Sequence, residues 1–299
     1  MGTVYLNPSR GAALLWVAAV YFVALSIAYS TAQAFPRLDP LFLAGVADLA
    51  ATVVVFGFSM VLSNASIYDP YWSVAPIPIT IFWAWTGFDS PVSPLRTVLI
   101  LALVCLWGVR LTFNWIRRWH GLADEDFRYT TIRKKTGRTF WLASLVAIHL
   151  MPTLWVFAGL LPLYPALSPW AERPFGALDV LAVVVILTAI IIETVADRQL
   201  CRFMSTRRDR SAVLDTGLWA ISRHPNYLGE VLFWWGIFLF GLAANPSWWW
   251  TVVGALSITG LFMFVSVPWM DRRMALGHPA YAARLKNTPA LFPWPRTRS

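Results

Sequence analysis

The stretch 177–198, with the sequence ALDVLAVVVILTAIIIETVADR, decides the fold class of this chain. Its apolar run is about as long as the roughly 20 residues that a helix needs to cross a bilayer. Acidic side chains occur near its two ends, and between Asp179 and Glu193 no residue is charged. The stretch therefore predicts a transmembrane helix.

The composition of the whole chain agrees with this prediction. Of its 299 residues, 58% are hydrophobic and only 13% are charged, against roughly 25% charged residues in a soluble domain. These values exclude a disordered chain, an ordinary soluble enzyme and a disulfide-rich secreted module. Cys105 and Cys201 form no CxxC pair, and no motif predicts a metal site.

Seven further apolar segments resemble the first, and together they predict an all-α polytopic bundle in one membrane domain covering residues 1–299. The segments are 11–34, 43–63, 74–88, 95–116, 139–161, 226–243 and 247–268. Eight spans are preferred, with seven as the alternative, because 74–88 is short and begins among prolines. The first segment could also be a signal peptide with an Ala32-Gln33-Ala34 cleavage site, but a retained helix fits its length better.

The basic residues are distributed unevenly between the loops. An eight-helix arrangement places 21 Lys and Arg residues on one side and leaves only Arg37, Arg96 and Arg173 on the other. The positive-inside rule then predicts cytoplasmic termini and an integral protein of a bacterial cytoplasmic membrane. The net charge of +9 is explained by topology and by phosphate-bearing ligands, so no nucleic-acid partner is expected.

Acidic residues inside apolar helices are candidates for function because a charge at bilayer depth is costly. Glu193 and Asp197 are four residues apart and so share one helix face, beside Arg198 and Arg202. An interfacial ion-pair cluster is the alternative interpretation. Asp48 is interpreted as structural, satisfied by a neighbouring helix.

The sequence GLWAISRHPNYLGE at 217–230 brings many polar residue types to one predicted helix start. Pro225 can open a helix, and the free N–H groups there, with Arg223 and His224, suit a phosphate or another anion. Asn226 and Glu230 would lie on one face, one turn apart. The alternative is a capped helix with an interfacial Arg-His pair.

Two more stretches combine polar and aromatic residues. RRWHGLADEDFRY at 117–129 fits either phosphate and ribose recognition or a basic loop with salt bridges. YDPYW at 68–72 fits either an acid with a raised pKa or an Asx-Pro turn in an aromatic belt.

Several of these pieces together resemble one known family. The 217–230 run, followed by FWWG at 233–236, is similar to the C-terminal half of the steroid 5α-reductase superfamily, and most of all to its bacterial branch, DUF1295. The other matching pieces are ETVAD at 193–197, EDFRY at 125–129 and the tail from Pro279 to Pro295. The resemblance covers about residues 60–295. Isoprenylcysteine and phospholipid methyltransferases carry a related Arg-His-Pro-x-Tyr-x-Gly.

The resemblance implies a membrane reductase that binds NADPH from the cytoplasmic side and transfers hydride to a double bond conjugated to a ketone. By position, it implies nucleotide contacts at Arg117, Arg118, Glu193, Asp197, Arg202, Arg223, His224, Asn226, Tyr227 and Glu230. It aligns Asp69 with an acid that binds the substrate carbonyl and places Trp107 near that carbonyl. From the chemistry of the neighbouring residues, we expect Tyr71 or Tyr68 to assist Asp69 and Trp72 to lie near the substrate. Two positions depart from the steroid reductases, which have Asn at 193 and Tyr at 107.

Three functions therefore remain open. The preferred one is a reductase of a lipophilic enone, steroid-like or isoprenoid-like, in contact with membrane lipids. The alternative is a membrane methyltransferase that uses S-adenosylmethionine. A transporter is the third, although the acids at 193, 197 and 230 gather toward one side rather than along a path.

Overall fold

The computed structural model describes residues 8–87, 93–207, 209 and 211–292. Within this part the chain forms helices and no strands, which confirms the all-α prediction. The chain divides into two compact units, each described by itself below. Unit 1 comprises residues 1–158 and 167–170, and unit 2 comprises residues 159–166 and 171–299.

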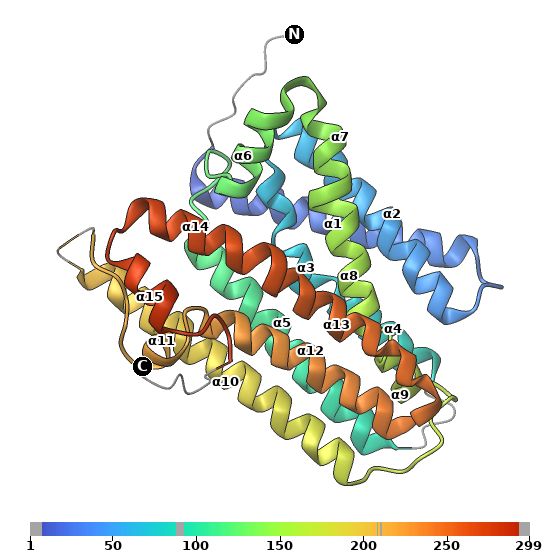
Figure 1. The fold of residues 1–299 in the computed structure, drawn as a ribbon. Coiled ribbons are helices and arrows are strands. Elements are labelled where there is room, and N and C mark those ends of the chain that lie inside the picture. The colour runs from blue at the N-terminus through green and yellow to red at the C-terminus, as the bar shows by residue number, and fades with distance from the viewer. Residues whose placement is uncertain (1–7, 88–92, 208, 210, 293–299) are drawn as a thin grey trace. The chain divides into compact units, whose positions relative to one another are not determined.

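Unit 1 is built around the long helices α1 (Arg10–Ala34), α2 (Pro40–Val61) and α5 (Pro94–Arg118), shown in Figure 1. Shorter helices connect and follow them. They are η1 (Ala65–Tyr68), α3 (Tyr71–Val74), α4 (Pro76–Thr86), α6 (Phe127–Thr136), η2 (Gly137–Thr139), α7 (Phe140–Ser144), the π-helix η3 (Leu145–Leu150) and α8 (Met151–Leu160).

Unit 2 contains the helices α10 (Ala177–Thr206) and α12 (Pro225–Ala244), which run side by side (Figure 1). The other helices are shorter. They are α9 (Leu163–Leu167), α11 (Leu218–Ile221), η4 (Pro246–Thr251), α13 (Val252–Leu261), the π-helix η5 (Phe262–Ser266), α14 (Val267–Gly277) and α15 (Tyr281–Asn287).

Seven helical segments of the described chain are long and apolar enough to cross a membrane. The segment 74–88 is not among them, because α4 has only 11 residues. At 1.5 Å per residue such a helix extends about 16 Å, roughly half of a hydrocarbon core. The preferred number of eight regular spans is therefore corrected to the alternative of seven.

The chain nevertheless returns across unit 1 between α2 and α5. Asn64, just after α2, donates from Nδ2 to the carbonyls of Leu122 (2.8 Å) and Asp124 (3.1 Å), just after α5. Near the end of α4, Trp83 donates to the carbonyl of Pro40 at the opposite end of α2 (3.2 Å). Helices α3 and α4, separated only by Ala75, thus cover most of the return.

In unit 2, α10 and α12 pack closely because α12 has glycine at the contact. A Cβ atom on Gly229 would lie 2.8 Å from the carbonyl oxygen of Ala189 and 2.8 Å from the Cβ of Glu193. A Cβ atom on Gly236 would collide with Ile186. The absence of a side chain at Gly229 therefore allows the backbone of α10 to come close to α12. Helix α12 is buried along most of its length.

Candidate functional site

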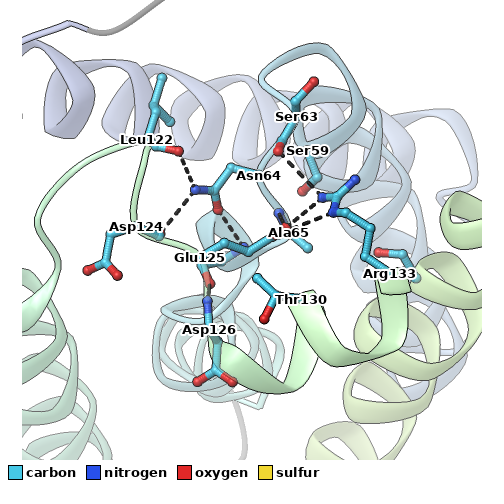
Figure 2. Close-up of polar contacts among 12 residues, drawn as sticks. Ser59, Ser63, Asn64, Ala65, Leu122, Asp124, Glu125, Asp126, Thr130 and Arg133 are labelled. Carbon is cyan, nitrogen blue, oxygen red and sulfur yellow. Dashed lines mark hydrogen bonds and ion pairs between the residues drawn. The ribbon is translucent and has the colours of Figure 1, made fainter. Parts of the chain in front are cut away.

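Two loops of unit 1 are joined by a network of polar contacts, called here the loop network (Figure 2). Glu125 accepts hydrogen bonds from the backbone N–H of Ala65 (3.0 Å) and from Nη2 of Arg133 (2.8 Å). The hydroxyl of Ser66 accepts from the backbone N–H of Asp126 (2.8 Å). Most polar groups of the predicted 125–129 element therefore face protein partners, which favours its salt-bridge interpretation.

Asp69 lies beside this network. Its Oδ1 accepts a hydrogen bond of 2.6 Å from the hydroxyl of Tyr129. The pKa of the Asp69 carboxyl is raised to about 7, first because burial penalises its charged form and second because Asp126 lies nearby. Hydrogen bonds from Tyr129 and Ser66 and the charge of Arg128 act in the opposite direction. The predicted raised pKa of Asp69 is thus supported, although its phenol partner is Tyr129 rather than Tyr71.

Tyr71 forms a pair with Asp48, for which the sequence predicts a structural role. The Tyr71 hydroxyl donates to Oδ1 of Asp48 at 2.7 Å and also lies 3.0 Å from the Asp48 carbonyl oxygen. Asp48 is only 5% exposed and Tyr71 is also 5% exposed. Both residues line an apolar pocket of about 580 Å³ between α1, α2 and the α3–α4 segment.

A chain of hydroxyl groups leads from Tyr68 to this pair. The Tyr68 hydroxyl lies 2.6 Å from that of Thr153, and Thr153 lies 2.8 Å from the hydroxyl of Thr52. The side chain of Thr52 in turn hydrogen-bonds Tyr71. The Thr153 hydroxyl also donates to the carbonyl of His149 (2.9 Å), and at the other end of the chain Tyr71 donates to Oδ1 of Asp48.

The other predicted residues of unit 1 lie elsewhere. Trp107 is fully buried and Trp72 is half-buried, and neither lines the apolar pocket. Arg117 and Arg118 are exposed at the end of α5, and the guanidinium of Arg117 lies 5.8 Å from the centroid of the Phe113 ring. These two arginines remain accessible to an anionic ligand.

In unit 2, Pro225 begins α12, as predicted from its place in the 217–230 motif. The residues before it converge on Asp271 of α14, forming what we call the Asp271 cluster. Arg223 approaches Asp271 through Nη2 (2.7 Å) and Nε (3.3 Å), and Nε2 of His224 lies 2.8 Å from Oδ1. The Tyr281 hydroxyl donates to the same oxygen at 2.6 Å.

The C-terminal segment closes over the Asp271 cluster. The backbone N–H groups of Arg223 and His224 donate to the carbonyls of Pro289 (2.9 Å) and Ala290 (3.0 Å). The Arg223 side chain also reaches the carbonyl of Thr288 at 2.5 Å. Arg223 and His224, both predicted to bind an anion, are thus occupied by protein groups. Tail residues 293–295 of the motif lie outside the described residues.

The remaining predicted residues lie on α10 and α12. Asn226 is half-buried on the first turn of α12, and its amide has no hydrogen-bond partner among the described residues. The ring of Tyr227 stacks on His224 at 5.2 Å, and Glu230 accepts a hydrogen bond from Nε1 of Trp234. On α10, Glu193 is buried, Asp197 is half-buried and Arg202 is exposed.

The fold and these sites define a polytopic helical membrane protein with buried acidic groups. The chain belongs to the family described as "Protein of unknown function (DUF1295)", which matches residues 55–288. An uncharacterized protein of Schizosaccharomyces pombe is similar, with 28% identity over 230 residues that cover 70% of this chain and 67% of the relative. Because this relative is fungal, the expected restriction to a bacterial branch is not supported. No solved structure matches the chain.

Proposed function

We propose that this protein is an NADPH-dependent reductase that adds hydride to the carbon–carbon double bond of a lipophilic enone. The observation that carries the proposal is the unpartnered amide of Asn226 on the first turn of α12. A carboxamide both donates and accepts hydrogen bonds, so it can pair with the carboxamide of nicotinamide. The resemblance to the steroid 5α-reductase superfamily assigns the same role to this position.

The phosphates of the nucleotide need other partners than those first expected. Asp271 neutralises Arg223 and His224, so in this proposal they hold the start of α12 in place and do not bind phosphate. Exposed arginines are better suited, because their guanidinium groups match phosphate oxygens. Arg202, exposed on α10 in the same unit as Asn226, offers such a guanidinium group.

Bound NADPH would supply the hydride. As hydride joins the β-carbon of an enone, the electron pair of the double bond moves toward the carbonyl oxygen and forms an enolate. A donor at that oxygen stabilises the new charge, and a proton then restores the ketone. Unit 1 offers two carboxyl groups for this work: Asp69, whose pKa near 7 keeps a proton available at neutral pH, and Asp48 with Tyr71.

The proposal also places the protein in a membrane with both termini in the cytoplasm, where the nucleotide would be available. Within unit 1, this orientation is supported by hydrogen bonds that gather the basic loops at one end. Arg10, at the start of α1, donates to the carbonyl of Trp119 at 2.9 Å, and Asn64 reaches the same loop. Arg37 follows the end of α1, and Arg96 lies in the first turn of α5, so both lie at the opposite ends of these two helices.

Nucleotide titration tests the proposal directly. The full chain, purified in mild detergent, is titrated with NADPH, NADH and S-adenosylmethionine while its thermal midpoint is recorded. We expect stabilisation by NADPH, and at least a tenfold weaker response after Asn226→Ala, because the amide is a direct ligand. Asn287→Ala, at an exposed amide of α15, should leave the response unchanged.

Two outcomes contradict the proposal. Stabilisation by S-adenosylmethionine and not by NADPH would assign the protein to methyl transfer instead. Wild-type NADPH affinity in the Asn226→Ala variant would show that this amide does not hold the nucleotide.

A further inference from the structure

The apolar pocket of unit 1 lies between α1 and α2, two of the candidate membrane spans, and the α3–α4 segment. Its walls consist mainly of small and apolar side chains of α1, α2 and the α3–α4 segment, including Ala28, Ala47 and Phe82. Asp48 is the only residue in the lining that carries an ionisable acid or base apart from tyrosines. A volume of about 580 Å³ is within the range of sites that enclose small organic ligands.

The depth of the pocket along α2 favours a lipophilic ligand. Asp48 lies eight residues from the start of α2 at Pro40, which corresponds to about 12 Å along the helix axis. Half of a hydrocarbon core is about 15 Å, so this carboxyl group lies deep in the apolar layer. Molecules that reach it from the bilayer are lipophilic.

The Asp48 carboxyl has one open oxygen. Tyr71 donates to Oδ1, and among the described residues no group hydrogen-bonds to Oδ2. The side chain is nevertheless 95% buried, since its residue is 5% exposed. Oδ2 is not among the fully enclosed unpaired side-chain atoms of the described chain, so it is reachable from the pocket, where a ligand can supply its hydrogen-bond partner.

The surroundings also indicate which polar group the ligand carries. No Lys, Arg or His of the described chain pairs with Asp48. A lone carboxylate at this depth is unfavourable, so the group stays neutral and donates from its open oxygen. A neutral carbonyl or hydroxyl oxygen accepts such a hydrogen bond. The donors converging through Thr52 and Tyr71 hold the carboxyl in one orientation.

We propose that this pocket binds a lipophilic molecule with one neutral oxygen group, a carbonyl or hydroxyl, held by Asp48. Of the two carboxyl groups considered above, this arrangement selects Asp48, because Asp69 does not line the pocket; Tyr71 is a positioning residue. The inference rests on the proposed function only where the ligand is called the enone substrate. The binding itself needs no nucleotide.

Photo-crosslinking tests the pocket without any cofactor. The full chain is placed in phosphatidylcholine vesicles with a diazirine derivative of the ketone 2-heptadecanone, irradiated, and mapped by mass spectrometry. We expect the label on peptides of α1, α2 and α4. Unlabelled 2-heptadecanone should compete at least tenfold better than heptadecane or heptadecylamine, because only the ketone offers a neutral acceptor.

Two pairs of variants decide the position and the polar contact. Ala47→Trp fills the pocket and should reduce labelling at least fivefold, whereas Leu49→Trp, at a 37% exposed position of the same helix, should not. Asp48→Leu should abolish the preference for the ketone over the hydrocarbon. Tyr71→Phe removes one hydroxyl group from the chain and should weaken that preference without unfolding the protein.

Several results would overturn the inference. These are full labelling in Ala47→Trp, an unchanged ketone preference in both Asp48→Leu and Tyr71→Phe, or better competition by the amine. If labelling follows expectation while NADPH binding fails, the ligand site stands and the reductase proposal falls. If NADPH binds and labelling fails, the reverse holds.

Discussion

Asp48 in unit 1 and Asp271 in unit 2 are both buried carboxyl groups, but they differ in the number of donors around them. Asp271 receives hydrogen bonds from Arg223, His224 and Tyr281, which occupy both of its oxygens. Asp48 receives one side-chain hydrogen bond, from Tyr71, and lines an apolar pocket. Filled acceptor sites are typical of a group that holds a fold together, whereas an open oxygen can still bind a ligand.

From the sequence alone, the region around Arg223 and His224 is the stronger candidate for a ligand site and Asp48 is the weaker one; the contacts in the structure reverse this order. The Arg-His pair at 223–224 looks like an anion site because it stands at a helix start, yet its charge is neutralised by an acid 48 residues away from Arg223. Asp48 looks like a structural acid because it stands alone among apolar residues. Because no other charged side chain of the described residues lies beside Asp48, its Oδ2 atom stays available to a ligand.

The largest expected effect is loss of the Asp271 cluster. Asp271→Asn leaves the guanidinium of Arg223 and the ring of His224 without their anion, and removing one partner of a buried ion pair typically costs about 3–5 kcal/mol. We expect a loss of that size in the free energy of unfolding, measured in detergent micelles. The matched variant Asp48→Asn should lose less than about 1 kcal/mol, because an amide oxygen still accepts from Tyr71.

Equal losses in the two variants would remove the contrast between a filled and an open carboxyl group. A larger loss in Asp48→Asn would reverse it, and would mean that Asp48 is the structural acid.

A smaller effect is expected from one donor of the cluster. Tyr281→Phe removes the 2.6 Å hydrogen bond to Asp271 while Arg223 and His224 remain. We expect a loss of about 1.5 kcal/mol in the free energy of unfolding, as for a hydrogen bond to a charged group. Tyr29→Phe, at a 66% exposed ring, is the control and should change stability little. A loss in Tyr281→Phe no larger than the control would mean that the hydroxyl contributes nothing to the cluster.

Local sequence signals made part of this fold predictable. Apolar runs identified seven spans, and Pro225 identified the start of α12, because both signals lie within one helix. The pairs that make the sites join distant segments: Tyr71 and Asp48 are 23 residues apart, and Thr52 and Thr153 are 101 apart. No spacing rule connects such positions, since helix packing brings them together.

At Asp48 the sequence carries a signal for function that its structural interpretation leaves unused. An acid alone in an apolar span is by default a functional candidate, because its burial has to be compensated. Asp48 met that condition from the start. For the Asp271 cluster, the signals were the polar run at 217–230 and the similarity of the tail around Tyr281 to a known family, and neither revealed that this tail closes over Arg223.

The smallest expected effect concerns Asp69, which stands between the two cases because it has a phenol donor like Asp48 and charged neighbours like Asp271. Its pKa is about 7 in the fold against 3.8 in an unfolded chain, so the folded protein binds more protons between these values. The contribution of Asp69 to stability is then fully present below pH 3.8 and is lost as pH rises through about 7. Since one pKa unit corresponds to about 1.4 kcal/mol, we expect wild type to lose roughly 1 kcal/mol relative to Asp69→Asn between pH 6 and pH 8. Unfolding titrations of both proteins across this range measure the difference, and a difference that is flat or grows in favour of wild type would show that Asp69 is ionised in the fold and is a charged member of the loop network.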